Sequence, residues 1–444
     1  MVQSPRYFSS VKLLRGQCTT DTLHGVMFNI SFHRESCNRR DFITAAGVLV
    51  VGGVLSCSRR EQIPSEQAHN QILQIPTTPI TMRVRIGKTR DPSGCTINGD
   101  QISRTARGWE LSQVSKVLLE TTDRGVAWIN TGSHTFSISE KTNRITGKIS
   151  LHPREDISTH AFDVVVHVPM ESYLPGVIAG ELFSHWHPNT FAAQAVAARS
   201  YASAQHLQRK TSSHFDVTDG PSSQVFLGDV TLGVAHRAVL ETRGIVLTWN
   251  NTIVPAYYSA CCGGLAATAV DAISNSPMNN IEPLLGQARK DVCTSLAVHK
   301  WTIERSHQHL RKRLTKWANT TKDFPLRQLQ SIQSITPAQT NKHGRPTTLQ
   351  VVDQNNTVHN INANQFVRAA NTTYPTLPSP NPRLWSSNLV ATRMGTTVEL
   401  RGRGMGHGVG LCQYGSQILA GKNKSWESIL FRYYPNVALG TIKS

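Results

Sequence analysis

The sequence is poor in acidic residues. Asp and Glu together number 28 against 46 Lys and Arg, which gives the 444-residue chain a formal net charge of +18. Such an excess of positive charge suits nucleic acid, an anionic membrane surface or an acidic polymer as a partner. The basic residues are scattered, however, and the sequence lacks both a Lys/Arg run interleaved with aromatic residues and any zinc-finger spacing. We therefore expect no nucleic-acid partner.

The motifs of several cofactor and metal sites are also missing. The sequence contains neither C-x-x-C nor H-E-x-x-H, so the spacing does not indicate a zinc site. The glycine-rich stretch "GRGMGHGVGLCQYG" at 402–415 lacks the final glycine of a dinucleotide-binding fingerprint and does not fit a phosphate-binding loop. We predict no metal site and no cofactor.

The N-terminal region lacks an apolar run long enough to span a membrane. Its apolar segment, from Ala45 to Leu55, is shorter than the ~20 residues that a spanning helix needs. Arg39 and Arg40 precede this segment, and a basic pair before a short apolar run is typical of an export signal, here of the twin-arginine class. An uncleaved N-terminal anchor is the alternative. Both interpretations place the working domain outside the cytoplasm, in the periplasm or cell envelope.

The residues around this predicted export signal indicate where it begins and ends. "VLSC", which ends at Cys57, resembles a lipoprotein cleavage box, so Cys57 is a candidate membrane tether. A start at Met27 would leave a basic leader of ordinary length. We therefore divide the chain into an export signal at 1–57, a linker with Gln, Pro and Ser at 58–80, and a domain at 81–440.

Cysteine is sparse after the leader. Five cysteines remain, an odd number that is too small for a disulfide scaffold. They are Cys95, Cys261, Cys262, Cys293 and Cys412. Export favours a Cys262–Cys293 disulfide, and metal binding by some of these cysteines with His299 is the alternative that we favour less.

Short stretches in which apolar and polar residues alternate predict strands. They lie at 82–87, 114–121, 125–130, 135–139, 161–168, 243–249, 252–260, 347–353 and 357–363, the last two as a hairpin. An Ala-rich stretch from Pro188 to Gln208 predicts a helix, because Pro188 suits the first turn and the apolar residues share one face. We expect an α+β fold of mixed, largely antiparallel strands around this central helix, and we interpret 300–345 as an insertion.

One carboxylate stands in unusually apolar surroundings. The stretch "GVIAGELFSHWHPNTFAAQAVAARSYASAQ" at 176–205 contains Glu181 among aliphatic residues. A helix over 171–182 would place Glu181 on an apolar face, where loss of solvent raises a carboxyl pKa and keeps the group protonated, as a general acid requires. Pro175 and Gly176 disturb a helix interior, however, and a surface glutamate at a helix end is the alternative.

The stretch "FDVTDGPSSQVFLG" at 215–228 also leaves two interpretations open. It carries Asp216, Asp219 and Gln224 on a turn-rich loop. These side chains either hold a sugar or form the turn itself.

The glycine-rich stretch at 402–415 is equally ambiguous. Alternating glycines leave one face of an extended segment without side chains, so that another backbone or a flat ligand can approach closely. His407 and Gln413 would lie near this face. The alternative is a closure of a barrel without any ligand.

Taken together, these stretches resemble the SpoIID/LytB family of sporulation lytic transglycosylases and amidase-enhancer-like proteins. The matching segments run in family order from about Val168 to Pro435, and the glycine-rich block with the Glu-bearing helix is the most specific part. The segments are "VPMESYLPGVIAGEL", "HPNTFAAQAVAARSYA", "SQVFLG", "AYYSACCGG", "DVCTSLAVHKW", "NANQFVRAA" and "GRGMGHGVGLCQYGSQILA…ILFRYYPN". The chain departs from the family at 95–150, at 300–345 and at Cys412.

The resemblance implies cleavage of peptidoglycan glycan strands between N-acetylmuramic acid and N-acetylglucosamine. Glu181 falls on the family's catalytic glutamate. It would protonate the glycosidic oxygen and then deprotonate the sugar's own 6-hydroxyl, which leaves a 1,6-anhydro end without the second carboxylate that other glycosidases need. The family positions that would bind the substrate are Arg199, Gln224, Ser259, His407 and Gln413.

The same resemblance supports a function of a different class. The protein would then be a non-catalytic wall-binding regulator that stimulates an amidase, and the amidase would be its partner. Some relatives bind zinc through Cys and His, but the sequence does not show that ligand set clearly, and a metal hydrolase is a third and weaker interpretation.

Overall fold

The computed structural model describes most of the chain after the predicted leader. It covers residues 73–444 except 90–93, 113–119, 123–124, 139–140, 222, 287–291, 294–295, 297–298 and 322–323. The predicted export signal, the alternative start at Met27 and the tether at Cys57 lie outside the described residues and stay predictions. In the described part of the chain, none of the helices is both long and apolar enough to cross a bilayer.

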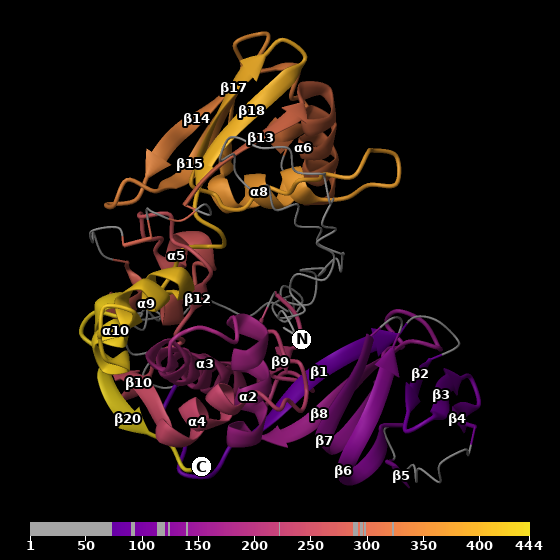
Figure 1. The fold of residues 1–444 in the computed structure, drawn as a ribbon. Coiled ribbons are helices and arrows are strands. Elements are labelled where there is room, and N and C mark those ends of the chain that lie inside the picture. The colour runs from indigo at the N-terminus through magenta and orange to yellow at the C-terminus, as the bar shows by residue number, and fades with distance from the viewer. Residues whose placement is uncertain are drawn as a thin grey trace, which may run out of the picture.

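A nine-stranded sheet forms the N-terminal part of the fold (Figure 1). Its strands follow the order β4-β3-β2-β6-β7-β8-β1-β9, with β5 beside β6. All neighbours are antiparallel except β1 and β9. The strands are β1 (Thr81–Thr89), β2 (Cys95–Ile97), β3 (Asp100–Thr105), β4 (Gly108–Leu111), β5 (Glu120–Thr121), β6 (Ala127–Ile138), β7 (Lys141–Pro153), β8 (Phe162–Pro169) and β9 (Val217–Thr218).

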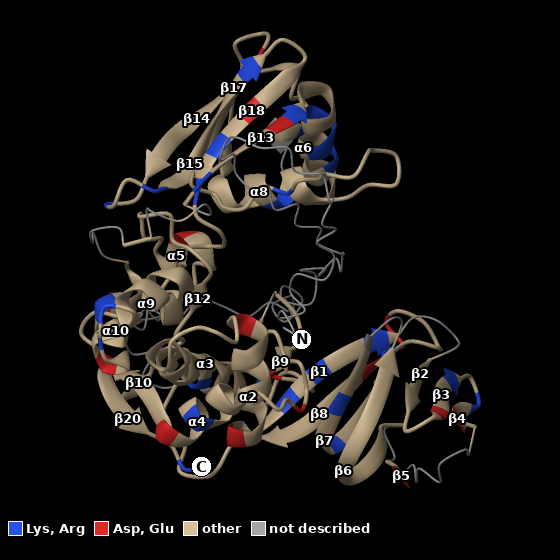
Figure 2. Cartoon of the chain, viewed as in Figure 1, with Lys and Arg blue, Asp and Glu red and all other residues tan. Residues whose placement is uncertain are grey.

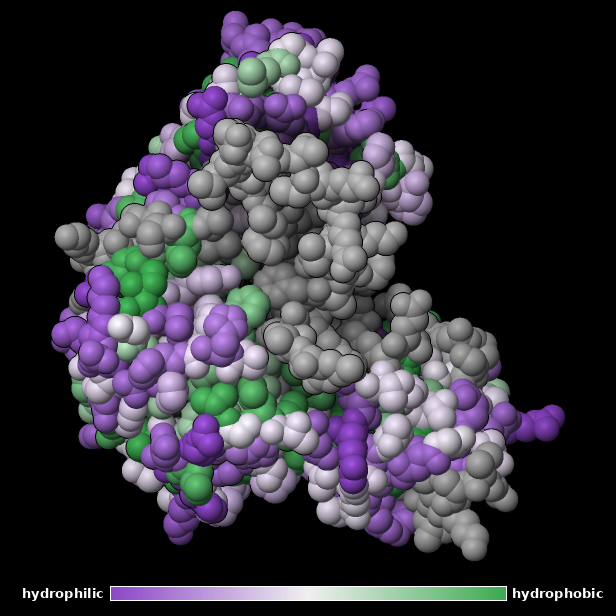
Figure 3. Space-filling view, in the orientation of Figure 1, coloured by the Kyte–Doolittle hydropathy of each residue, from purple (hydrophilic) through white to green (hydrophobic). Residues whose placement is uncertain are grey.

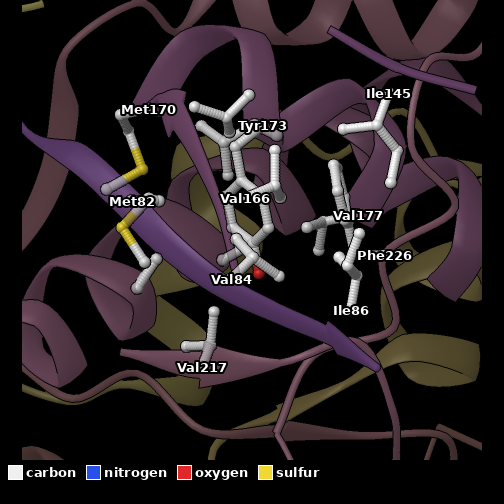
Figure 4. Packing of buried hydrophobic residues seen from close by; sticks show 14 of the residues in the cluster. Met82, Val84, Ile86, Ile145, Val166, Met170, Tyr173, Val177, Val217 and Phe226 are labelled. Atoms are coloured by element: carbon white, nitrogen blue, oxygen red, sulfur yellow. The ribbon is translucent and has the colours of Figure 1, made fainter. Parts of the chain in front are cut away.

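Alternation in β1 sets the face that this sheet buries. Met82, Val84 and Ile86 point to one side, as the period of two residues requires, and all three are buried. Figure 4 shows them against Tyr173 and Val177 of the following helix. The two strands predicted at 125–130 and 135–139 form the single strand β6, whose register against β7 shifts once, between Ile129 and Gly132.

Three helices pack beside the sheet. They are α2 (Met170–Glu181), α3 (Pro188–Arg209) and α4 (Gly233–Glu241). The predicted Ala-rich helix is confirmed as α3, which begins with Pro188 after the capping residue His187. Its alanines are buried on several sides because small side chains let neighbouring elements approach it closely. This central helix therefore contributes to two hydrophobic clusters, one with the sheet and one with the C-terminal helices.

The middle of the molecule is built from short elements far apart in sequence. Strands β10, β11 and β20 form one small sheet, and β12 pairs in parallel with β19. These elements are β10 (Ile245–Trp249), β11 (Thr252–Ile253), β12 (Tyr258–Ser259), α5 (Ala269–Ala272), η3 (Pro277–Asn279), η4 (Glu282–Leu284), β19 (Leu411–Cys412), α9 (Gln413–Ala420), α10 (Trp426–Tyr433) and β20 (Ala438–Thr441). The single strand predicted at 252–260 is wrong: it is split into β11 and β12, and Pro255 between them cannot donate a ladder hydrogen bond.

A third unit, residues 300–403, stands at the far end of the molecule (Figure 1). Its antiparallel sheet has the order β13-β18-β17-β14-β15-β16 and its own hydrophobic cluster. The elements are β13 (Lys300–Ser306), α6 (His307–Thr321), α7 (Phe324–Arg327), β14 (Ile332–Thr340), β15 (Pro346–Asp353), β16 (Val358–Asn362), α8 (Ala363–Asn371), β17 (Leu389–Met394) and β18 (Thr397–Arg403). Residues 300–345 thus supply the first half of this unit. On the face seen in Figure 3 it presents mainly hydrophilic side chains.

These elements confirm the α+β fold predicted from the sequence, including the hairpin of β15 and β16. Figure 2 shows Lys and Arg spread over the sheets and helices rather than gathered on one element. The distribution of charge therefore follows the scattering already visible in the sequence.

Candidate active site

A cavity of about 390 Å³ lies between the end of α2, the paired strands β12 and β19, and the glycine-rich segment before β19. Leu384 and Trp385 of the six-stranded unit complete its wall. Its aromatic lining residues are Phe183, Trp186, Tyr201, Tyr257, Tyr258, Trp385 and Tyr414. Among the described residues that line the cavity, Glu181 carries the one carboxylate. An apolar cavity with a few polar groups is the usual form of a small-ligand site.

Three donors hold the Glu181 carboxylate at the cavity wall. The backbone N–H of Val225 donates to Oε1 at 3.1 Å, and the hydroxyl of Tyr258 donates to the same oxygen at 3.4 Å. The side-chain amide of Gln413 donates to Oε2 at 3.2 Å. These donors come from three segments that the chain brings together only on folding, so the position of the carboxylate depends on the tertiary structure.

The surroundings of Glu181 favour its protonated form. Burial removes solvent from the carboxyl group and raises its pKa above the ordinary value of 4.5. The hydrogen bonds from Val225, Gln413 and Tyr258 oppose this shift without cancelling it. A carboxyl group with a raised pKa can donate a proton near neutral pH and accept one afterwards.

Two glycines in α2 allow Val225 to reach Glu181. A Cβ at Gly176 would lie 2.4 Å from the carbonyl oxygen of Gly228, and a Cβ at Gly180 would lie 2.8 Å from Cγ1 of Val225. The segment 225–228 can therefore lie directly against the helix, with Val225 opposite the last helical residue. The predicted helix over 171–182 is confirmed, with Pro175 inside it.

The glycine-rich segment forms the opposite wall by close backbone packing. A Cβ at Gly404 would lie 2.6 Å from the carbonyl oxygen of Cys261, and one at Gly410 would lie 2.1 Å from that of Tyr257. The sequence predicted that another backbone could approach these glycines closely, and the backbone of residues 257–263 does so. The segment is not extended as predicted, because alternate glycines adopt positive φ, a region open to residues without a Cβ.

Four of the residues predicted for the site meet at this cavity: Glu181, Ser259, His407 and Gln413. The Ser259 hydroxyl accepts a hydrogen bond from the backbone N–H of Gly408 at 3.2 Å. His407 accepts from the backbone N–H of Val409 through Nδ1 at 3.0 Å. Burial and the nearby Arg345 cation lower the pKa of His407 to about 4, so its imidazole is neutral at physiological pH.

Gln224 lies one layer behind the cavity. Its side-chain amide donates to the hydroxyl of Tyr258 at 3.1 Å and to the carbonyl oxygen of Ala198, while its Oε1 accepts from Tyr173. Because Tyr258 in turn donates to Glu181, Gln224 acts on the carboxylate through this tyrosine. Its contacts are those of a positioning residue.

Arg199 is not one of the described residues that line the cavity. Its guanidinium is fully buried and forms a two-point ion pair with Glu171, with nitrogen–oxygen distances of 2.7 and 2.9 Å. It also donates to the carbonyl oxygen of Ile245. Arg199 therefore connects α3 to α2 and β10. Its guanidinium N–H donors find acceptors in the Glu171 carboxylate and a backbone carbonyl oxygen within the protein.

The polar loop at 215–228 contributes one residue to the packing of the fold and another to the cavity wall. Asp216 is buried and pairs with Arg83 and His206. These contacts favour the structural interpretation for Asp216, whereas Ser223 of the same loop lines the cavity.

The sequence analysis assigns no role to Tyr258 or to the aromatic lining. Tyr258 stands immediately before Ser259 within "AYYSACCGG", so its adjacency to a predicted site residue was the available signal. No such signal exists for Trp385, which comes from the six-stranded unit and reaches the cavity through the tertiary fold.

The preferred Cys262–Cys293 disulfide is wrong for this structure. No disulfide joins the cysteines in the described part of the chain, and the Sγ atoms of Cys262 and Cys293 are 3.9 Å apart. A disulfide needs about 2.05 Å between its sulfur atoms. The Sγ atom of Cys293 lies nearer to that of Cys261, at 3.3 Å.

Comparison with known sequences finds two family regions, which together cover most of the site but not Gln413. The SpoIID family model, described as Stage II sporulation protein, matches residues 158–249, and a domain of unknown function, DUF8618, matches residues 252–410. The chain thus contains a SpoIID family domain, which carries Glu181 and Gln224. Ser259 and His407 fall within the second match.

Three relatives show how far the similarity extends. An uncharacterized protein of Brachyspira hyodysenteriae is 28% identical over 276 residues, which cover 62% of this chain and 67% of the relative. The amidase enhancer of Bacillus subtilis is 28% identical over 298 residues, 60% of this chain but only 40% of the relative. Stage II sporulation protein D of Bacillus subtilis is 24% identical over 291 residues, 61% of this chain and 74% of the relative.

Proposed function

We propose that the protein is a peptidoglycan lytic transglycosylase that cleaves glycan strands between N-acetylmuramic acid and N-acetylglucosamine. The SpoIID family and the names of the relatives support a function related to the cell wall. The observation that carries the proposal is the single carboxylate, Glu181, held with a raised pKa at the wall of an aromatic cavity.

One carboxylate suffices if the substrate supplies its own nucleophile. Glycosidases that use water or an enzyme nucleophile require a pair of acidic residues beside the scissile bond. Here the protonated carboxyl of Glu181 would donate its proton to the glycosidic oxygen as the bond from C1 of N-acetylmuramic acid breaks. The N-acetylglucosamine side then leaves as an alcohol.

The second proton transfer closes the product. The resulting Glu181 carboxylate would accept the proton of the muramic acid 6-hydroxyl as its oxygen bonds to C1, which forms the 1,6-anhydro ring and restores the acid. The amide of Gln413 and the hydroxyl of Tyr258 stabilise the carboxylate between the two transfers. No water enters the reaction.

The walls of the cavity suit a polysaccharide. Aromatic rings offer broad apolar surfaces with polar edges, which match the mixed apolar and polar faces of sugar rings. Ser259 and Ser223 add hydroxyl groups to the lining. An exported location, as the twin-arginine signal predicts, would give the protein access to this substrate.

Substitution of the proposed acid tests the function. Glu181→Gln keeps the size of the side chain but cannot donate a proton, and loss of a general acid costs about 10²–10⁴-fold in rate. The measurement is the formation of 1,6-anhydromuramyl ends from peptide-free glycan strands, followed by mass spectrometry. Glu241→Gln is the matched control, because Glu241 is also the last residue of a helix but is exposed.

The outcomes separate the roles. The proposal requires Glu181→Gln to bind glycan strands as well as the unchanged protein while its turnover collapses, with Glu241→Gln fully active. Near-normal turnover in Glu181→Gln would show that the proposed acid is not the one used.

The relative named amidase enhancer supports a second candidate, a non-catalytic regulator that binds the wall and stimulates an amidase. The same assay distinguishes it. A protein that produces no anhydro ends, yet raises the rate of a purified amidase on whole peptidoglycan, would be such a regulator.

A further inference from the structure

Beside the cavity, four cysteines from three segments converge in the protein interior. The Sγ atoms of Cys261, Cys293 and Cys412 all lie within 4.8 Å of one another, and all three residues are buried. Cys262 is close as well, with its Sγ 3.9 Å from that of Cys293. The proposed reaction uses none of these thiols.

We propose that Cys261, Cys293 and Cys412 bind a zinc ion as thiolates, with Cys262 at the fourth position. Zinc takes four ligands in a tetrahedron with Zn–S distances of about 2.3 Å, which places the sulfur atoms about 3.8 Å apart. The Cys261–Cys293 and Cys262–Cys293 separations of 3.3 and 3.9 Å lie on either side of this value, and the three sulfur atoms of Cys261, Cys293 and Cys412 lie within 4.8 Å of one another. Soft thiolate ligands in this geometry select zinc among the common divalent ions.

The surroundings of Cys412 suit a thiolate. Its sulfur accepts hydrogen bonds from the backbone N–H groups of Cys262 at 3.4 Å and Gly415 at 3.3 Å. Hydrogen bonds to sulfur stabilise its negative charge, and such outer contacts orient metal ligands.

A buried arginine points to negative charge at the same place. Arg345 is 2% exposed, and the hydrogen bonds of its guanidinium within the described part of the chain go to backbone carbonyl oxygens. Its guanidinium donates to the carbonyl oxygens of Cys262 and Leu265, both at 3.0 Å, while its Nε has no hydrogen-bond partner. A zinc ion with four thiolates has a net charge of −2, which would offset this buried cation.

The position of the cluster gives the site a structural role. Cys261 follows Tyr258 by three residues, and Cys412 immediately precedes Gln413. Strands β12 and β19 pair between these points, with Ser259 opposite Cys412. A metal bound here would fix the two segments that carry the side-chain donors to Glu181. With four thiolates the zinc ion has no open position for a substrate.

Metal content of the full chain tests the site without any substrate, so the result is independent of the proposed function. We expect one zinc ion per chain by plasma mass spectrometry after purification with zinc present in the growth medium. Cys412→Ser and Cys293→Ser should lose this zinc. Cys95→Ser is the matched control, because Cys95 is buried in the N-terminal sheet away from the cluster, and it should keep the zinc.

Cobalt replacement tests the site without any substitution, so its result does not depend on whether the cysteine variants fold. The unchanged protein, stripped of metal and loaded with Co²⁺, should show the strong sulfur-to-cobalt charge-transfer absorption of thiolate ligands. Absence of this band, absence of zinc, or an intact mass lower by two hydrogens from a Cys261–Cys293 disulfide would each overturn the proposal.

Discussion

At the scale of single residues, the site depends on the balance of two opposing effects on Glu181. Burial raises the pKa of its carboxyl group, and three hydrogen-bond donors lower it. A general acid is active in its protonated form, so activity is expected to fall as the pH rises through the pKa of Glu181. In the proposed reaction, burial and the hydrogen-bond donors together therefore set the alkaline limit of activity.

Tyr258→Phe should move that limit upward. The change removes a donor that stabilises the carboxylate, which raises the pKa of Glu181. A hydrogen bond to a charged group contributes about 1.5 kcal/mol at its weaker end, and one pKa unit corresponds to about 1.4 kcal/mol. We therefore expect the alkaline limb of the rate profile to shift by about one pH unit toward higher pH.

Tyr257→Phe is the control for this measurement. Tyr257 lines the same cavity, but its hydroxyl donates to Asn279 at 2.9 Å rather than to Glu181. Its variant should keep the original profile. An alkaline limb that stays in place in Tyr258→Phe, or moves equally in both variants, would contradict the role given to Tyr258.

Residue chemistry explains which site residues the sequence could identify. Glu181 is recognisable because a carboxylate in an apolar stretch is unusual. The sequence does not show whether Arg199 points toward a ligand or toward Glu171, because a helix position alone does not fix what its side chain meets. For the same reason, the sequence does not show the contact between Tyr258 and Glu181.

At the scale of elements, helix α2 forms despite two residues that disfavour a helix interior. Pro175 lacks an N–H, and Gly176 lowers helix propensity. Tertiary packing outweighs both, because Gly176 lets the segment 225–228 lie against the helix. A residue that is unfavourable for the isolated helix is thus required by its neighbours.

Gly176→Ala should therefore destabilise the protein. The added Cβ would lie 2.4 Å from the carbonyl oxygen of Gly228 and 2.8 Å from the ring of Phe226. Overpacking of this kind costs roughly 1–3 kcal/mol, which exceeds the gain of up to about 1 kcal/mol in helix propensity. Urea unfolding measures the loss.

Gly233→Ala supplies the comparison within another helix. Gly233 is the first residue of α4, and a Cβ there would meet only Arg237, at 4.0 Å. We expect this variant to be unchanged or slightly more stable. Equal stability of the two alanine variants would show that the contact between α2 and 225–228 is not tight.

At the scale of the whole molecule, the six-stranded unit interrupts the chain between the two halves of the site. The chain leaves β12, forms residues 300–403 and returns to β19, which pairs with β12. The backbone N–H of Gly406 donates a hydrogen bond to the carbonyl oxygen of Trp385, so this unit is joined to the glycine-rich wall. The unit therefore contributes to the cavity rather than standing apart from it.

Trp385→Ala should weaken substrate binding more than it slows the chemistry. Trp385 lines the cavity but is not one of the donors to Glu181, so KM is expected to rise by about tenfold, which corresponds to ~1.4 kcal/mol of lost contact, with little change in kcat. Steady-state kinetics on glycan strands provide the measurement.

Trp317→Ala is the matched control within the same unit. Trp317 packs partly buried against the unit's own core and away from the cavity. A KM that rises equally in both variants would mean that the unit acts through its stability and not through its contact with the substrate.

The sequence by itself determined several of the strands, the Ala-rich helix and the carboxylate of interest, because alternation, helix periodicity and an acid among apolar residues are local patterns. It did not determine the course of the glycine-rich segment, where positive φ at alternate glycines follows from packing against 257–263. Only the tertiary structure decided which donors meet Glu181 and which thiols meet one another. Those contacts join residues separated by tens to hundreds of positions, and their distances depend on how whole elements pack.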